Sequence, residues 1–175
     1  MSRFGTEYQV SKPTGTCAAT GGALEPGMAC IATLCERVDD DGFERLDYSL
    51  EAWQSGARPQ RLFSYWRTTI PEPGGRRKLL VDDEVLLDLF ERLEGDERPQ
   101  RIALRFVLAL ILMRKRLLRF DGRIDVAGDE PERWRFRRKG SSLDDPMPEV
   151  VNPQLGDGDV LEISAELSEV LQGEW

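Results

Sequence analysis

The sequence of 175 residues has no histidine, only three cysteines and no long apolar run. Without histidine it lacks the commonest general base and the commonest zinc ligand in proteins. Chemistry of the Ser-His-Asp type is therefore excluded. The longest unbroken apolar run, Phe106 to Met113, covers eight residues, whereas ~20 are needed to cross a bilayer. We expect no membrane partner.

The cysteines are an odd number and show no disulfide-dense pattern. The stretch Cys17-x-x-Thr20-Gly21 resembles half of a zinc knuckle in which Thr20 replaces a second cysteine. A structural zinc site uses four Cys or His ligands, so we predict no metal and no cofactor. If a metal is bound, the ligands would be Cys17, Cys30 and Cys35, completed by a carboxylate. Otherwise Cys30 and Cys35 are small buried apolar side chains of a strand.

Other catalytic and targeting signatures are also missing. The first residues after Met1 are mostly polar, so we expect no signal peptide and a reducing cytoplasm as the compartment. The glycines of residues 15–27 match neither a phosphate-binding loop nor a dinucleotide fingerprint. An enzyme of unrecognised type is therefore only the third hypothesis for function.

The pattern of the first part predicts a small antiparallel β-rich region, residues 1–75. Strands are expected at 7–10, 28–37, 43–48 and 62–70, where β-branched and aromatic residues alternate with polar ones. The turn Asp39-Asp40-Asp41-Gly42 joins the second and third of them into a hairpin. Ser49 is expected to cap a short helix.

The remainder, residues 76–175, predicts a helical core with a β-hairpin. A linker at 71–78 precedes a helix that Asp82 caps and Gly95 closes. Residues 100–118, after a first-turn Pro99, form the buried central helix. A hairpin within 118–136 and an amphipathic helix after Asp157 follow. The fold class is α+β, as two parts or as one continuous domain.

Charge is unevenly distributed along the chain. The net charge is −8, but residues 98–139 hold 13 Lys and Arg against 5 Asp and Glu, a local balance of +8. The other 133 residues hold 11 basic and 27 acidic groups, a balance of −16. A basic segment within an acidic chain is the feature that best indicates a binding surface.

Alternation in this segment predicts a strand with one basic and one apolar face, because Trp134 and Phe136 separate three arginines. The leading hypothesis is a non-catalytic interaction or assembly module with an unknown protein partner. The alternative is a nucleic-acid-associated protein that binds weakly through residues 114–139. A purely structural role is also open, through the helix dipole and through pairing with acidic residues. The candidate binding residues are Arg114, Lys115, Arg116, Arg119, Arg133, Arg135 and Arg137.

A group of aromatic residues permits two interpretations, a ligand platform or a second small core. We favour the core. Each face of the strand at 62–70 carries an aromatic side chain, so both faces are expected to be covered. Asp47 and Arg67 are expected to pair across it. The aromatic residues are Tyr48, Trp53, Phe63, Tyr65 and Trp66.

Several short strings together resemble a family of uncharacterised bacterial proteins. The resemblance covers nearly the whole chain; it implies a single fold and carries no assigned activity or site. The strings are Cys17-x-x-Thr20-Gly21, Leu24-x-Pro26-Gly27, Phe43-x-Arg45-x-Asp47-Tyr48, Phe63-x-Tyr65-Trp66-Arg67-Thr68-Thr69, Lys78-Leu79-Leu80-Val81-Asp82-Asp83, and Arg105-Phe106-Val107-Leu108-Ala109-Leu110 through Arg114-Lys115-Arg116.

Overall fold

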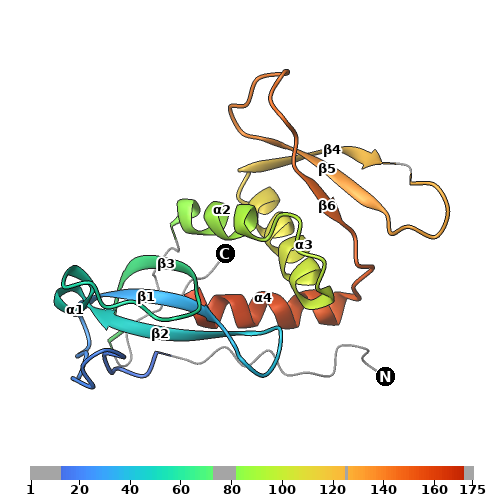
Figure 1. Ribbon diagram of the computed structural model, residues 1–175. Helices are drawn as coiled ribbons and strands as arrows, with labels where there is room; N and C mark the ends of the chain where they lie inside the picture. The colour runs from blue at the N-terminus through green and yellow to red at the C-terminus, as the bar shows by residue number, and fades with distance from the viewer. Residues whose placement is uncertain (1–12, 73–81, 125, 172–175) are drawn as a thin grey trace. The chain divides into compact units, whose positions relative to one another are not determined.

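A computed structural model describes residues 13–72, 82–124 and 126–171 of the chain (Figure 1). The expected strand at 7–10 and most of the expected linker lie outside these residues. The chain divides into two compact units, residues 1–81 with 165–174 and residues 82–164 with residue 175. The boundary expected at residue 75 falls in the stretch that is not described.

The fold is α+β, as expected. An antiparallel sheet of three strands is followed by helices, a second antiparallel sheet of three strands and a C-terminal helix. No helix within the described ranges is long and apolar enough to cross a membrane. The elements in chain order are β1 (Ala29–Glu36), β2 (Phe43–Ser49), α1 (Leu50–Gln54), β3 (Leu62–Thr69), α2 (Asp83–Arg92), α3 (Pro99–Arg114), β4 (Leu118–Ile124), β5 (Arg133–Arg138), β6 (Glu149–Val151) and α4 (Asp157–Leu171).

The first sheet has the order β2-β1-β3, with β1 in the centre. The predicted hairpin is confirmed: Glu36 pairs with Phe43 across the turn, and Gly42 N–H donates to the Asp40 carboxylate at 2.8 Å. β3 returns along the other edge of β1, with a register shift between Leu34 and Cys35. The strand predicted at 62–70 is therefore confirmed as well.

The central strand β1 is buried on both of its faces, because Cys30, Ala32 and Leu34 point one way and Ile31 and Thr33 the other. The two edge strands, β2 and β3, are less completely buried than β1. The burial of β1 places the core of the first unit around it.

Two expectations about β3 are wrong. Only one of its faces is covered: Ser64 and Trp66 are buried, but Tyr65 is 52% exposed and Arg67 is exposed. Asp47 does not pair with Arg67. The register places Asp47 and Trp66 on either side of Ala32, on the same face of the sheet, and Arg67 points to the other face. Asp47 is buried and binds Arg45 instead, with 2.9 Å between Asp47 Oδ1 and Arg45 Nε.

The second unit is built around α3, which starts at Pro99 as predicted. Its predecessor α2 starts after Asp82, whose carboxylate accepts from Glu84 N–H at 3.1 Å. α3 is buried along most of its length from Arg101 to Leu112, which confirms the central buried helix. Leu110 within it is only half-buried.

The predicted end of α3 at Leu118 is wrong by four residues, because the helix ends at Arg114. The Arg116 N–H donates to the Met113 carbonyl and the Leu117 N–H to the Leu112 carbonyl, each at 2.9 Å. This pair of bonds is a Schellman motif. It holds Arg116 at φ 62°, where glycine is usual.

The second sheet has the order β4-β5-β6, all antiparallel. The hairpin of β4 and β5 is confirmed, and the short strand β6 was not predicted. β6 has only three residues, too few for a visible alternation. The predicted C-terminal helix is confirmed as α4, in which Leu167 and Leu171 are buried.

Candidate interaction surface

Four arginines share one face of the second sheet. In β5, Arg133, Arg135 and Arg137 alternate with Trp134 and Phe136, so they point to the same side. Arg119 of β4 lies directly opposite Arg137. We call these four residues (Arg119, Arg133, Arg135, Arg137) the arginine face. The basic side of this strand was predicted from the sequence, but the contribution of Arg119 to it required the register.

The opposite face of the same sheet is fixed by aromatic packing. Phe136 is fully buried, and Trp134 lies edge-on to Phe106 of α3 with 5.2 Å between ring centroids. Phe120 contacts both Trp134 and Phe136. Because the aromatic side packs on α3, the arginine face is held outward by the core rather than by its own contacts.

Two carboxylates also lie against the arginine face. Arg135 Nη2 is 3.5 Å from Glu149 Oε1, and Arg137 Nε is 3.4 Å from Asp121 Oδ1. Both pairs are long and partly exposed, so each contributes about 0–1 kcal/mol to stability. Arg119 and Arg133 are exposed and have no ion pair with any described residue. The surface therefore keeps a positive balance, with weak internal competition.

The other three candidate residues lie apart from this face, at the corner between α3 and β4. Lys115 Nζ binds Asp83 Oδ1 at 2.7 Å, which ties the end of α3 to the start of α2. Arg114 and Arg116 are exposed. All three residues lie at the negative end of the helix dipole, where positive charge is stabilising.

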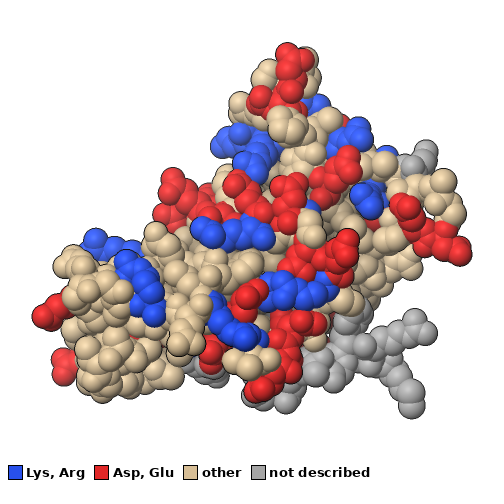
Figure 2. All heavy atoms as spheres, in the orientation of Figure 1, with Lys and Arg blue, Asp and Glu red and all other residues tan. Residues whose placement is uncertain are grey.

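Much of the basic segment is paired within its own unit. Eight of its 13 Lys and Arg form ion pairs with carboxylates, so the count of +8 overstates the charge available to a partner. Near the second sheet, basic side chains lie beside acidic ones (Figure 2). The pairs are Arg98–Asp96, Arg101–Asp96, Arg105–Glu94, Lys115–Asp83, Arg123–Glu132, Arg135–Glu149, Arg137–Asp121 and Arg138–Glu91.

Two arginines of this segment are buried, which the sequence analysis missed. Arg101 is 1% exposed and binds Asp96 at 3.3 Å. Arg105 is 8% exposed; its Nε donates to the Phe90 carbonyl at 3.2 Å and its Nη1 to the Glu149 carbonyl at 2.8 Å. Burial lowers the pKa of Arg105. The sequence contains one sign of this burial, because both arginines lie in the helix predicted to be apolar and buried.

The aromatic group divides between core and surface. Tyr48 and Trp66 are buried, as the core interpretation expects, whereas Trp53 is half-buried beside the exposed Tyr65, with 5.0 Å between ring centroids. The Arg58 guanidinium lies 3.6 Å from the Trp53 centroid. This guanidinium covers the ring, so Trp53 does not present a bare platform.

The three cysteines are free and buried. Cys30 and Cys35 lie on opposite faces of β1, because they are five positions apart in a strand. Burial raises the pKa of both thiols, that of Cys30 to about 11. Among the described residues, no group of three His, Cys, Asp or Glu side chains is placed to hold a metal ion.

Cys17 differs from the other two. Burial alone would raise its pKa, but hydrogen bonds from the Ser49 N–H, the Thr20 hydroxyl and the N–H groups of Thr20 and Ala19 lower it to about 7. The Ser49 N–H lies 3.3 Å from the sulfur. The thiol is 2% exposed, so these donors act in a nearly closed site.

The chain matches no family model, no curated protein and no solved structure. Its resemblance to a bacterial family stays a prediction, and any function has to be argued from the geometry above.

Proposed function

We propose that the protein is a non-catalytic interaction module whose arginine face binds an acidic segment of a protein partner. The observation that carries this proposal is the convergence of Arg119, Arg133, Arg135 and Arg137 on one solvent-facing side of a sheet. Arginine presents a planar fork of donors that fits carboxylates in a bidentate manner. A rigid sheet therefore offers several carboxylate positions in a fixed register.

The weak pairs on this face support exchange with a partner. A carboxylate from outside could replace Glu149 on Arg135 or Asp121 on Arg137, since contacts at 3.4–3.5 Å are easily released. Exposed Arg119 and Arg133 add charge without any such exchange. Steering by this local field would mainly accelerate association.

A nucleic acid is the second candidate, and charge argues against it. The unit of residues 82–164 holds 14 Lys and Arg against 19 Asp and Glu. A phosphate backbone carries one charge at every step, so it would meet Asp121 and Glu149 on the same face. A protein segment with spaced carboxylates avoids that repulsion.

The test uses charge reversal on each face of the same sheet. We expect Arg119→Glu with Arg133→Glu to weaken binding of a labelled peptide with spaced glutamates by at least ~10-fold at low salt. Arg123→Glu with Arg138→Glu is the matched control, because it makes the same charge change on the opposite face. A labelled oligouridine of equal charge is measured in parallel by fluorescence anisotropy.

The outcomes separate the hypotheses. Peptide binding that depends on the arginine face but not on the control residues supports the proposal. Tighter binding of the RNA, with a steep salt dependence, would favour the nucleic-acid alternative. Equal effects of both variants, with both proteins folded, would mean that the arginine face only balances the charge of acidic residues in the same chain.

A further inference from the structure

The edge strands of the two sheets differ in how their outer backbone groups are covered. An edge strand presents a row of N–H and C=O groups to which another strand can bind, unless these groups are blocked. On β2 the Asp47 carbonyl accepts from the Ala18 N–H at 2.8 Å. On β6 the Glu149 carbonyl accepts from Arg105 Nη1 at 2.8 Å. β4 carries three charged residues and a bulge next to Gly122, and both features hinder the addition of a strand.

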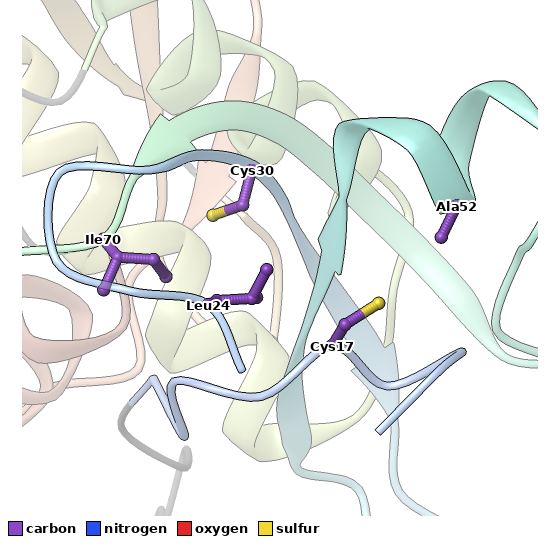
Figure 3. Packing of buried hydrophobic residues seen from close by; sticks show 5 residues of the cluster. All are labelled: Cys17, Leu24, Cys30, Ala52 and Ile70. Atoms are coloured by element: carbon purple, nitrogen blue, oxygen red, sulfur yellow. The ribbon is translucent and has the colours of Figure 1, made fainter. Parts of the chain in front are cut away.

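Among the edge strands of the described ranges, β3 has no such cover. Its end is fixed by Ile70, which belongs to the buried cluster that also contains Leu24 and Cys30 (Figure 3). The Ile70 N–H donates to the Met28 carbonyl at 2.9 Å, and the Ile70 carbonyl accepts from the Gly27 N–H at 2.8 Å. Both backbone groups of Ile70 therefore point to the side of β1.

Alternation along β3 then determines which groups point outward. In an antiparallel sheet, the N–H and C=O groups of successive residues point to opposite sides of the strand. Because those of Ile70 point inward, those of Tyr65, Arg67 and Thr69 point away from β1. Within the described part of the chain, these outward groups have no hydrogen-bond partner. β3 therefore offers a row of free donors and acceptors, which we call the open edge (Tyr65, Arg67, Thr69).

The side chains along the open edge favour an acidic occupant. Tyr65 is 52% exposed and lies beside Trp53, with 5.0 Å between ring centroids. Arg67 is exposed and forms no ion pair with a described residue. Residues 52–71 contain three arginines and no Asp or Glu. An acidic strand would therefore meet positive charge without a competing carboxylate from this segment, whereas a second copy of β3 brings no carboxylate for Arg67.

We infer that the open edge binds an extended segment of a partner protein as a fourth strand of the first sheet. Main-chain hydrogen bonds to Tyr65, Arg67 and Thr69 hold this segment, which is the mode of strand addition. On the exposed face, its side chains lie beside those of Tyr65 and Arg67. The segment therefore carries an apolar and an acidic residue two positions apart. This surface is distinct from the arginine face, which binds through side chains.

The test uses a labelled peptide in which threonine separates alternating valine and glutamate. When its glutamates lie beside Arg67, the N–H groups of valine and glutamate point to β3 and those of threonine point away. N-methylation of valine and glutamate should therefore weaken binding by at least ~10-fold. N-methylation of the threonines is the matched control and should have little effect. Fluorescence anisotropy with the unaltered protein compares the three peptides, so this test requires no variant to fold.

Two substitutions of Arg67 separate its backbone from its side chain. Arg67→Ala removes the charge but keeps the N–H, and it should weaken binding of the unmethylated peptide by no more than ~5-fold. Arg67→Pro also removes the outward N–H, and it should weaken binding at least ~10-fold further. Edge strands accept proline at such a position, and circular dichroism checks the fold. Arg119→Glu with Arg133→Glu, on the arginine face, should leave this affinity unchanged.

Hydrogen exchange locates the bound strand. The peptide should slow exchange of the Tyr65, Arg67 and Thr69 amides by at least ~10-fold, and it should not affect Leu118 and Phe120, whose N–H groups point outward on β4. Equal binding of the two methylated peptides would overturn the inference. Protection of the same three amides by self-association, without peptide, would also overturn it, because a second copy would then occupy the open edge.

Discussion

Both sheets have three antiparallel strands, but one contains a buried ion pair and the other an ion pair at the surface. In the first sheet, Arg45 and Asp47 are both 2% exposed and bind each other inside the unit. In the second, Arg137 and Asp121 make the same type of pair at the surface. A charge pair that is buried on folding cannot be exchanged, whereas a surface pair can, so of these two pairs only Arg137–Asp121 is open to exchange with a charge from outside.

The largest expected effect concerns the support beneath the second sheet. Leu108 of α3 is fully buried. Replacing it by Asp buries an unpaired charge, so we expect loss of cooperative unfolding, at a cost of several kcal/mol. Leu110→Asp, at a half-buried position of the same helix, should be milder. Circular dichroism with urea titration measures both, and equal stability of Leu108→Asp and the unaltered protein would contradict the assignment of α3 as core.

The next effect compares the two charge pairs directly. Asp47→Ala removes one member of the buried Arg45–Asp47 ion pair, which should lower the free energy of unfolding by ~3–5 kcal/mol. Asp121→Ala removes the partner of an exposed arginine and should cost less than ~1 kcal/mol. Chemical denaturation of both variants tests the contrast, which fails if the two costs are similar.

An intermediate case is the carboxylate before α3. Hydrogen bonds from Arg98 lower the pKa of Asp96 to about 2, although burial opposes this. Since the folded pKa lies below the unfolded value, Asp96 stabilises the fold above pH ~4 and loses this effect as the pH falls toward 2. Asp96→Asn should cost ~1 kcal/mol at pH 7 after allowance for solvent screening.

The pH profile separates this effect from a simple loss of packing. The stability difference between Asp96→Asn and the unaltered protein should shrink as the pH is lowered from about 4 toward 2. Thermal unfolding between pH 2 and 7 measures it. A difference that stays constant over that range would mean that ionisation of Asp96 plays no part.

The smallest effect lies at the corner where α3 meets β4. Arg116 adopts φ 62°, so Arg116→Gly should raise the free energy of unfolding by ~0.5–1 kcal/mol. Arg114→Gly, inside the last turn of α3, should lower it by a similar amount. Opposite signs for two charge-removing changes only two positions apart would show that backbone conformation, not charge, decides the result.

The sequence predicts the helices and strands better than it predicts the contacts between them. Alternation and capping residues locate both hairpins, α1, α2 and α4, because these are local effects. The end of α3 was missed because its Schellman motif uses Arg116 where glycine is usual. β6 was missed because a strand of three residues is too short to show an alternation of apolar and polar residues.

The candidate surface shows the same division. Alternation in β5 predicts one basic face, and the register adds Arg119 to it. That pattern does not reveal Asp121 and Glu149, which reach the face only through strand pairing and a register shift next to Gly122. The Cys17 site depends even more on tertiary structure, since Ser49 is 32 positions away in the chain.

Arg105 has a consequence for the order in which the second unit opens. Its guanidinium binds the carbonyls of Phe90 and Glu149 at the same time, although 59 positions separate these residues. The end of α2 and the strand β6 therefore share one cross-link through α3. Segments joined in this way open together, so their amide protons should exchange with solvent as a single cooperative group.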